Sequence, residues 1–88
     1  MSKLRKAAGR FSETVIEGEV VVMNLDDGVF FSLTGTAAAG WHLIDGTRDR
    51  AELVSALAKE FATDPQTVAA DLDPFLGQLI EAGLVESG

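Results

Sequence analysis

The chain has 88 residues, of which 47% are apolar, and a formal net charge of −7. A chain of this length supports one domain with a modest core, so a binding role is favoured over an enzyme with a walled active site. The sequence has no cysteine and a single histidine, His42, which excludes disulfides, thiolate catalysis and cysteine- or histidine-rich metal sites. We therefore expect no catalytic residue, no metal and no cofactor.

The N-terminal end of the chain differs from the rest in charge. Four of the seven basic residues lie in the first ten positions, namely Lys3, Arg5, Lys6 and Arg10. This stretch shows no hydrophobic periodicity, and chain termini are commonly disordered. We predict a flexible basic arm over residues 1–10, with order beginning near Phe11, and a single domain over residues 11–88.

The body of the chain is acidic. Residues 11–88 hold three basic and fourteen acidic side chains, a balance that repels phosphate backbones and argues against a nucleic-acid partner. The basic start lacks the apolar segment of a signal peptide, and no apolar run approaches the length needed to span a membrane. The expected location is the cytoplasm, without a membrane partner.

Residues 12–33 have the pattern of a three-stranded antiparallel meander. Residues 12–17 alternate weakly, and Glu17-Gly18 offers a turn before the apolar, mostly β-branched run Val20 to Met23, which is typical of a central strand covered on both faces. Asp27-Gly28 is a pair that tolerates the positive φ angles of a tight hairpin turn. The third strand is then residues 29–33, and the first and third strands are edges.

The third strand is the stretch on which the functional prediction depends. Thr34 or Thr36 can cap a helix directly after it, so no linker separates the strand from the helix. An edge strand held this way can offer its free N–H and C=O groups to an extended peptide. Phe30 and Phe31 must point to opposite faces, so one packs in the core and the other, if exposed, belongs to an apolar groove.

Two helices are predicted after this strand. The first spans residues 37–44, with Ala37, Trp41 and Ile44 on one face, and ends at Asp45-Gly46. The second begins with a capping box formed by Asp49 and Glu52. Its core stripe is expected to contain Leu53, Leu57 and Phe61.

A third helix is predicted over residues 65–82. Asp64-Pro65 provides a side-chain acceptor at the cap followed by proline at the first helical position, and Gly83 ends the helix. The predicted core face consists of Val68, Leu72, Leu76 and Leu79. A second stripe beside it consists of Asp71, Phe75 and Gln78. Pro74 removes one backbone hydrogen bond within this helix and is expected to bend it or leave a carbonyl to water.

These elements predict an α+β fold, and their order resembles a known family. The resemblance covers residues 17–85 and is to the PqqD-like peptide chaperones, also called recognition elements for ribosomally synthesised, modified precursor peptides. It rests on Gly18, residues 20–25, Asp27-Gly28, residues 30–33, Thr36, Ala38, Trp41, Asp45-Gly46, Asp49, Glu52-Leu53, Leu57, Phe61, Asp64-Pro65, Asp71, Phe75-Leu76, Leu79 and Gly83-Leu84. Two features depart from the family pattern: Pro74, and Gly35-Thr36 in place of an asparagine-rich turn.

The resemblance implies a winged-helix-like arrangement without DNA binding. It implies that the leader region of a precursor peptide lies antiparallel along the third strand, in a cleft with the third helix. It also implies a partner that modifies or processes the peptide: a radical S-adenosylmethionine enzyme in pyrroloquinoline quinone formation, or a leader protease or cyclase in lasso-peptide and related pathways. The predicted peptide-binding residues are Val29, Phe30, Phe31, Ser32, Leu33, Asp71, Leu72, Phe75, Gln78 and Leu79.

Other readings of the sequence stay open at this point. A winged-helix DNA-binding regulator would need basic residues on the third helix, and residues 65–82 contain none. A carrier-like adaptor would need a serine at a helix start, whereas Ser32 is expected on a strand. Residues 20–23 place apolar side chains on both faces of the sheet, and three helices cover only one face. We expect the other face to be shielded by the first strand and the Phe11 region, by a partner enzyme, or by a second copy in a homodimer.

Overall fold

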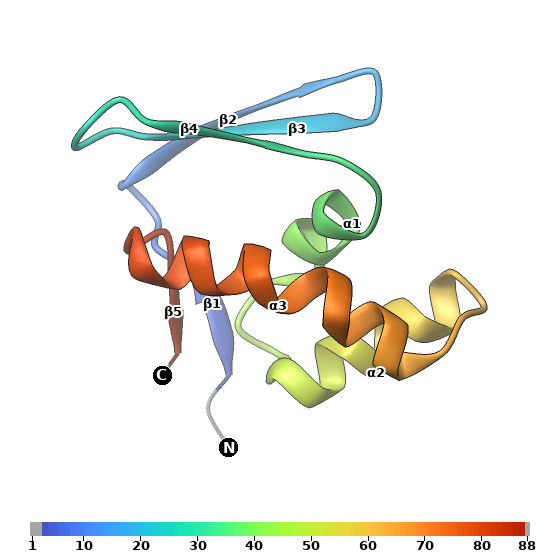
Figure 1. The fold of residues 1–88 in the computed structure, drawn as a ribbon. Coiled ribbons are helices and arrows are strands. Elements are labelled where there is room, and N and C mark those ends of the chain that lie inside the picture. The colour runs from blue at the N-terminus through green and yellow to red at the C-terminus, as the bar shows by residue number, and fades with distance from the viewer. Residues whose placement is uncertain (1–2, 88) are drawn as a thin grey trace.

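The computed structural model describes residues 3–87 (Figure 1). Its elements in chain order are β1 (Leu4–Lys6), β2 (Phe11–Ile16), β3 (Glu19–Asn24), β4 (Phe30–Leu33), α1 (Gly35–Leu43), α2 (Arg50–Glu60), α3 (Pro65–Glu81) and β5 (Val85–Ser87). The predicted fold class is confirmed, because β2, β3 and β4 form an antiparallel sheet and the three helices follow it. The sheet forms one layer and the helices lie together beneath it (Figure 1).

The sheet has the order β2-β3-β4, so β2 and β4 are its edge strands, as predicted. The hairpin turns contain Gly18 and Gly28, whose φ angles are +82° and +74°, and these positive values favour glycine. Val20 and Val22 are buried on the face toward the helices. Met23 lies on the opposite face and is 37% exposed, so the elements within residues 3–87 fully cover only one face of β3. All helices lie on one side of the sheet (Figure 1).

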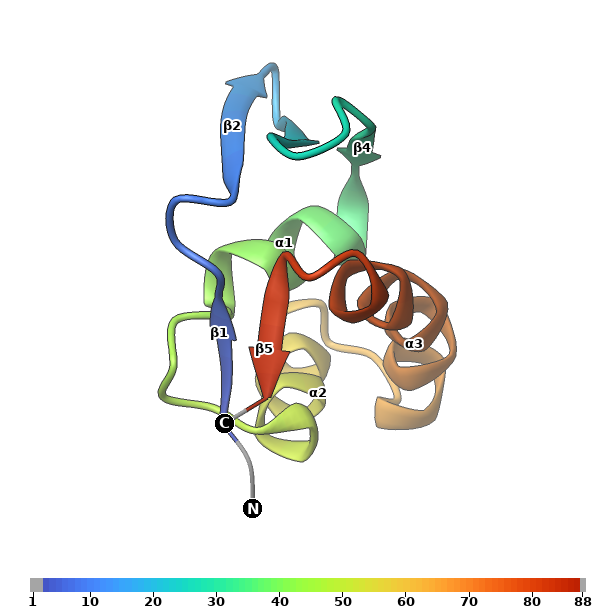
Figure 2. The ribbon, with the colours of Figure 1, turned by 90° about the vertical axis from the view of Figure 1, so that its left-hand side faces the viewer.

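The structure also corrects the prediction for residues 1–10. Residues 4–6 form β1, which pairs antiparallel with β5 at the other end of the chain (Figure 2). Leu4 is only 4% exposed and Ala7 is equally buried, so order begins well before Phe11. A strand this short shows no recognisable alternation, and its pairing partner lies at the far end of the sequence. Met1 and Ser2 lie outside the described residues.

The basic side chains of this segment pack against the body of the domain. Salt bridges join Lys3 to Glu52 at 2.7 Å, Arg5 to Glu86 at 3.2 Å and Arg10 to Asp26 at 2.9 Å. The Lys6 ammonium lies 4.8 Å from the centroid of the Trp41 ring, a cation–π distance. The positive charges at the N-terminal end are therefore engaged with acidic and aromatic groups of the domain.

Trp41 on α1 connects the helices to the sheet. It is fully buried, and its indole N–H donates a hydrogen bond of 3.0 Å to a carboxylate oxygen of Glu13 on β2. The Phe11 ring meets it edge-on, with ring centroids 5.1 Å apart. A Cβ atom added to Gly40, the preceding residue, would lie 3.0 Å from a methyl group of Leu72 on α3. The absence of a side chain at this position therefore permits the close approach of α1 and α3.

The predicted helix starts are confirmed for α2 and α3. Asp49 and Glu52 form the capping box of α2, with reciprocal bonds of 2.8 and 3.0 Å. Asp64 accepts a hydrogen bond from the backbone N–H of Gln66 at the start of α3. Helix α3 continues through Pro74 to Glu81. Phe61 is the exception to the predicted core, because α2 ends there and leaves the ring 44% exposed.

An ion pair connects the start of α2 to α3. The Arg50 guanidinium donates two hydrogen bonds, of 2.7 and 2.6 Å, to the carboxylate of Asp73. These bonds, and then the Arg50 charge, hold the pKa of Asp73 below its ordinary value against the opposing effect of desolvation. The lowered pKa stabilises the fold above the pKa of the unfolded chain, and this contribution is lost as the pH falls through the folded-state pKa.

We expect Asp73→Asn to lower the free energy of unfolding at neutral pH by less than about 1 kcal/mol, because the pair is half exposed. The difference from wild type should shrink in acid, where the carboxyl group of the wild-type chain is protonated. Urea unfolding at neutral pH and in acid measures this difference in the free energy of unfolding. Asp71→Asn is the control on the same helix. A difference that persists in acid would mean that Asp73 contributes through packing rather than charge.

Candidate functional site

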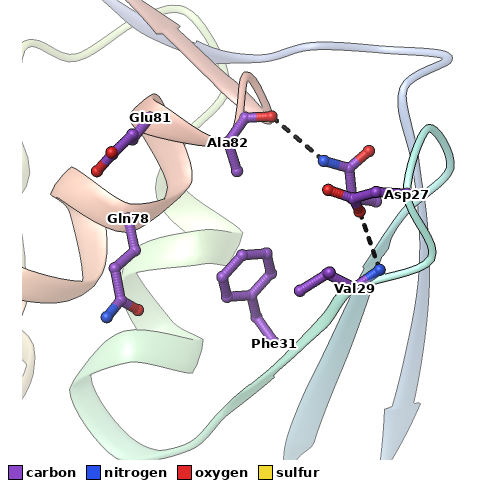
Figure 3. Close-up of a pocket in the computed structure, with 7 residues that line it drawn as sticks. Asp27, Val29, Phe31, Gln78, Glu81 and Ala82 are labelled. Atoms are coloured by element: carbon purple, nitrogen blue, oxygen red, sulfur yellow. Dashed lines mark hydrogen bonds between the residues drawn. The ribbon is translucent and has the colours of Figure 1, made fainter.

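A cleft opens between β4 and the C-terminal end of α3 (Figure 3). Its volume is about 260 Å³. The lining residues come from the end of β3, the turn after it, β4 and the last turns of α3. They are Asn24, Asp27, Val29, Phe31, Gln78, Glu81 and Ala82.

The apolar part of the lining comes mainly from β4 and the residue before it. The register pairs Phe31 with Val22, whose side chain is buried beneath the sheet, so Phe31 points to the same side as the helices. Its ring is half-buried against the core and lies between β4 and α3 (Figure 3). Val29 adds a half-exposed apolar side chain nearer the turn. A partner entering the cleft therefore contacts an aromatic ring that is already packed against the core.

Asn24 holds the turn end of the cleft in place. Its side chain is 4% exposed, and its amide donates a hydrogen bond of 3.3 Å to the carbonyl oxygen of Ala82 at the end of α3. The amide oxygen accepts a bond of 2.9 Å from the backbone N–H of Asp26. Asp27 in turn accepts from the backbone N–H of Val29 at 2.9 Å. These bonds fix the spacing between the sheet and α3 before any ligand arrives.

The open edge of β4 runs beside this cleft. The backbone N–H of Asn24 donates to the carbonyl of Val29, which places this pair in a hydrogen-bonded register position. Hydrogen-bonded pairs alternate along an antiparallel ladder, so Phe31 and Leu33 also face β3. The N–H and C=O groups of Phe30 and Ser32 therefore point away from the sheet. No strand within residues 3–87 pairs with that side of β4.

The cleft carries negative charge at its turn end. Asp27 and Glu81 contribute carboxylates to the lining, which contains no lysine or arginine. Arg10, the basic residue near the end of α3, is engaged by Asp26. The cleft therefore favours neutral or basic side chains over acidic ones at this end.

The structure brings together part of the predicted site. Of the predicted peptide-binding residues, Val29, Phe31 and Gln78 line the cleft. Phe30 and Ser32 lie on the opposite face of the sheet, and Ser32 donates a hydrogen bond to Glu19 there.

Other predicted site residues lie elsewhere. Leu72 and Leu79 are 0% exposed and Leu33 is also buried, so these three belong to the core rather than to the cleft wall. Phe75 packs half-buried against the core, and Asp71 is exposed on α3; neither lines the cleft.

Four lining residues were not predicted: Asn24, Asp27, Glu81 and Ala82. Extending the stripe of Phe75 and Gln78 by one helical turn would have reached Ala82, because residues four apart share a helix face. Asp27 was recognised only as a turn residue. Asn24 gives no local signal, because its partner Ala82 is far away in the sequence.

Comparison with known proteins decides the family. The model described as "Coenzyme PQQ synthesis protein D (PqqD)" matches residues 19–85. The chain belongs to the PqqD family. The match includes the sheet from β3 onward, all three helices and therefore both walls of the cleft. The comparison with curated proteins gave no match.

A solved structure gives the PqqD-family chain a close structural relative. It is described as "TbiB1 in Complex with the TbiA(beta) Leader Peptide". The two chains share 31% sequence identity and a TM-score of 0.76, over 92% of this chain and 94% of the other. The relative is thus a protein of the same fold and nearly the same extent, with a leader peptide bound.

No group of three or more histidine, cysteine, aspartate or glutamate side chains within residues 3–87 could hold a metal ion. The helices of the same range include none long and apolar enough to cross a membrane.

Proposed function

We infer that this PqqD-family chain binds the leader region of a ribosomally synthesised precursor peptide as an added strand on β4. The observation that carries the inference is the edge of β4, which pairs with no strand within residues 3–87 and lies beside a preformed cleft. Backbone groups of Phe30 and Ser32 would supply the ladder bonds, and Phe31 would receive an apolar side chain of the peptide. The leader peptide bound to the relative TbiB1 supports the same class of ligand.

The chain would act without catalysis, by presenting the peptide to a separate enzyme. A radical S-adenosylmethionine enzyme, a leader protease or a cyclase fits this role. Each apolar side chain buried in the cleft contributes about 1.5–3 kcal/mol, whereas ordering each peptide residue costs about 1–2 kcal/mol. Because these terms nearly cancel, binding is reversible, which suits a protein that hands its ligand on.

The two competing functions lack support in the geometry. A winged-helix regulator would present basic residues on α3, and this helix carries no lysine or arginine. A carrier protein would place its modified serine at the start of a helix. Ser32 instead lies within β4 and is hydrogen-bonded to Glu19.

Replacing Phe31 by alanine tests the cleft. We expect the affinity for the leader peptide to fall by roughly 1–3 kcal/mol in binding free energy, because the peptide loses the aromatic floor of the cleft. Titration of a fluorescently labelled leader, taken from a precursor gene beside this one, measures the change. Circular dichroism checks that the variant is folded.

Phe61→Ala is the matched control, since Phe61 is also a partly exposed phenylalanine but lies at the end of α2, outside the cleft lining. Equal losses of affinity in the two variants would argue against the cleft as the binding site.

A further inference from the structure

The face of the sheet that points away from the helices carries an apolar groove. Its volume is about 270 Å³, and its lining consists of Ser12, Thr14, Val21, Met23 and Phe30. Phe30 is 66% exposed, the highest value among the exposed large apolar side chains of residues 3–87. Large apolar side chains grouped on an exposed face mark binding surfaces. Strand addition to β4 with an apolar side chain in the cleft makes no use of this groove.

Phe30 belongs both to the groove and to the pairing edge of β4. Its N–H and C=O groups point to the open side of the strand, so an added strand would place one residue directly opposite it. Directly opposed residues send their side chains to the same face of a sheet, with Cβ atoms about 4.5–5.5 Å apart. The side chain opposite Phe30 would therefore lie against its ring, on the outer face.

The next residue of the added strand has the opposite orientation. It lies across from Phe31, and because side chains alternate along a strand, it points into the cleft. A single extended segment on β4 thus offers adjacent side chains to two different apolar surfaces. Phe31 receives one of them and Phe30 receives its neighbour.

We propose that the outer groove at Phe30 is a second subsite for the leader segment. This subsite takes an apolar or aromatic side chain that is adjacent in sequence to the one held in the cleft. The inference rests on the proposed strand addition to β4. The chain should therefore prefer leader segments with two consecutive apolar residues over segments with apolar residues at alternate positions only.

Continuity with the pairing edge favours the leader over a second copy of this chain as the occupant. The groove ends at the strand on which the leader would lie, so a bound leader necessarily covers the open side of Phe30. Two copies meeting through this face would bring together chains with a formal charge of −7 each. The carboxylate of Glu19 lies on the same face, beside Ser32, so each copy would also bring this negative charge to the shared face.

A displayed library of short random peptides, selected on the full chain, provides the probe. Peptides that bind wild type but not Ser32→Pro are those that pair with β4, and these are carried forward. We expect them to be enriched in adjacent pairs of apolar residues. We also expect Phe30→Ser to weaken their binding roughly 5–10-fold. Ile16→Ser should leave binding unchanged, since Ile16 is a similarly exposed apolar residue at the far edge of the sheet.

A double-mutant cycle tests whether the outward apolar residue of the peptide contacts Phe30. Replacing the outward apolar residue of a selected peptide by alanine should weaken binding to wild type but not to Phe30→Ser. Additive losses, or equal effects of Phe30→Ser and Ile16→Ser, would overturn the second subsite while leaving strand addition intact. A dimer in sedimentation that Phe30→Ser dissociates would overturn it in favour of a second copy. If every selected peptide binds Ser32→Pro normally, both the strand addition and the subsite are wrong.

Discussion

Deleting residues 1–7 should lower the free energy of unfolding by about 3–5 kcal/mol, the range for losing buried aliphatic side chains together with their packing. The deletion removes Leu4 and Ala7, both buried, and the backbone partners of Leu84 and Val85. It also breaks the β1–β5 ladder, which holds the C-terminal strand in place. Chemical denaturation of the deleted and full chains measures the difference.

Single substitutions separate packing from charge in this segment. Leu4→Ala alone should account for about 2–4 kcal/mol of the loss. Arg5→Ala, at the exposed neighbouring position, should change stability by less than about 1 kcal/mol, because its bridge to Glu86 is a surface ion pair. A deleted chain as stable as the full one would restore the original prediction of a flexible arm. The domain would then begin near residue 11.

The second large effect is expected from Ser32→Pro. Proline removes the N–H of Ser32, which points to the open edge, and places a ring where the added strand must approach. The fold should survive, since the ladder to β3 uses Phe31 and Leu33 instead. Binding of the leader peptide should weaken by about 2–3 kcal/mol, or about 30–150-fold, measured by titration.

Two variants control for loss of the Ser32 hydroxyl and for the presence of a proline in an edge strand. Ser32→Ala removes the hydroxyl and its bond to Glu19 but keeps the N–H, so it should bind the leader nearly as well as wild type. Val15→Pro places proline at an outward-facing position of β2, the opposite edge of the sheet, and should leave binding intact. If all three variants bind equally, neither edge of the sheet takes up the peptide.

Local patterns were sufficient to predict most of the fold. The apolar, mostly β-branched run from Val20 to Met23 between two glycine turns predicted the meander, and the capping residues Asp49 and Asp64 predicted two helix starts. The β1–β5 pair could not be predicted this way, because its strands are very short and come from opposite ends of the chain. Phe61 continued the spacing of Leu57 but fell where α2 ends, so periodicity alone misassigned it to the core.

The candidate site was predicted only in part, because it too depends on contacts between residues far apart in the sequence. The resemblance implied a cleft along residues 29–33, and the structure places Val29 and Phe31 in the lining of the cleft. The helix wall depended on which face of α3 is buried. Leu72 and Leu79 were assigned to both the core and the cleft wall, and the structure places them in the core alone. The hydrogen bond from the Asn24 side chain to the carbonyl oxygen of Ala82 joins residues far apart in the sequence, so no local pattern predicts it.

Amide hydrogen exchange on β4, with and without the leader peptide, tests the strand-addition account most directly. In the free chain the N–H groups of Phe31 and Leu33 are bonded to β3 and should exchange slowly, whereas those of Phe30 and Ser32 should exchange fast. Saturation with the peptide should protect Phe30 and Ser32 specifically. If both amides still exchange fast while the peptide is bound, it does not pair with β4, and the proposed mode of binding is wrong.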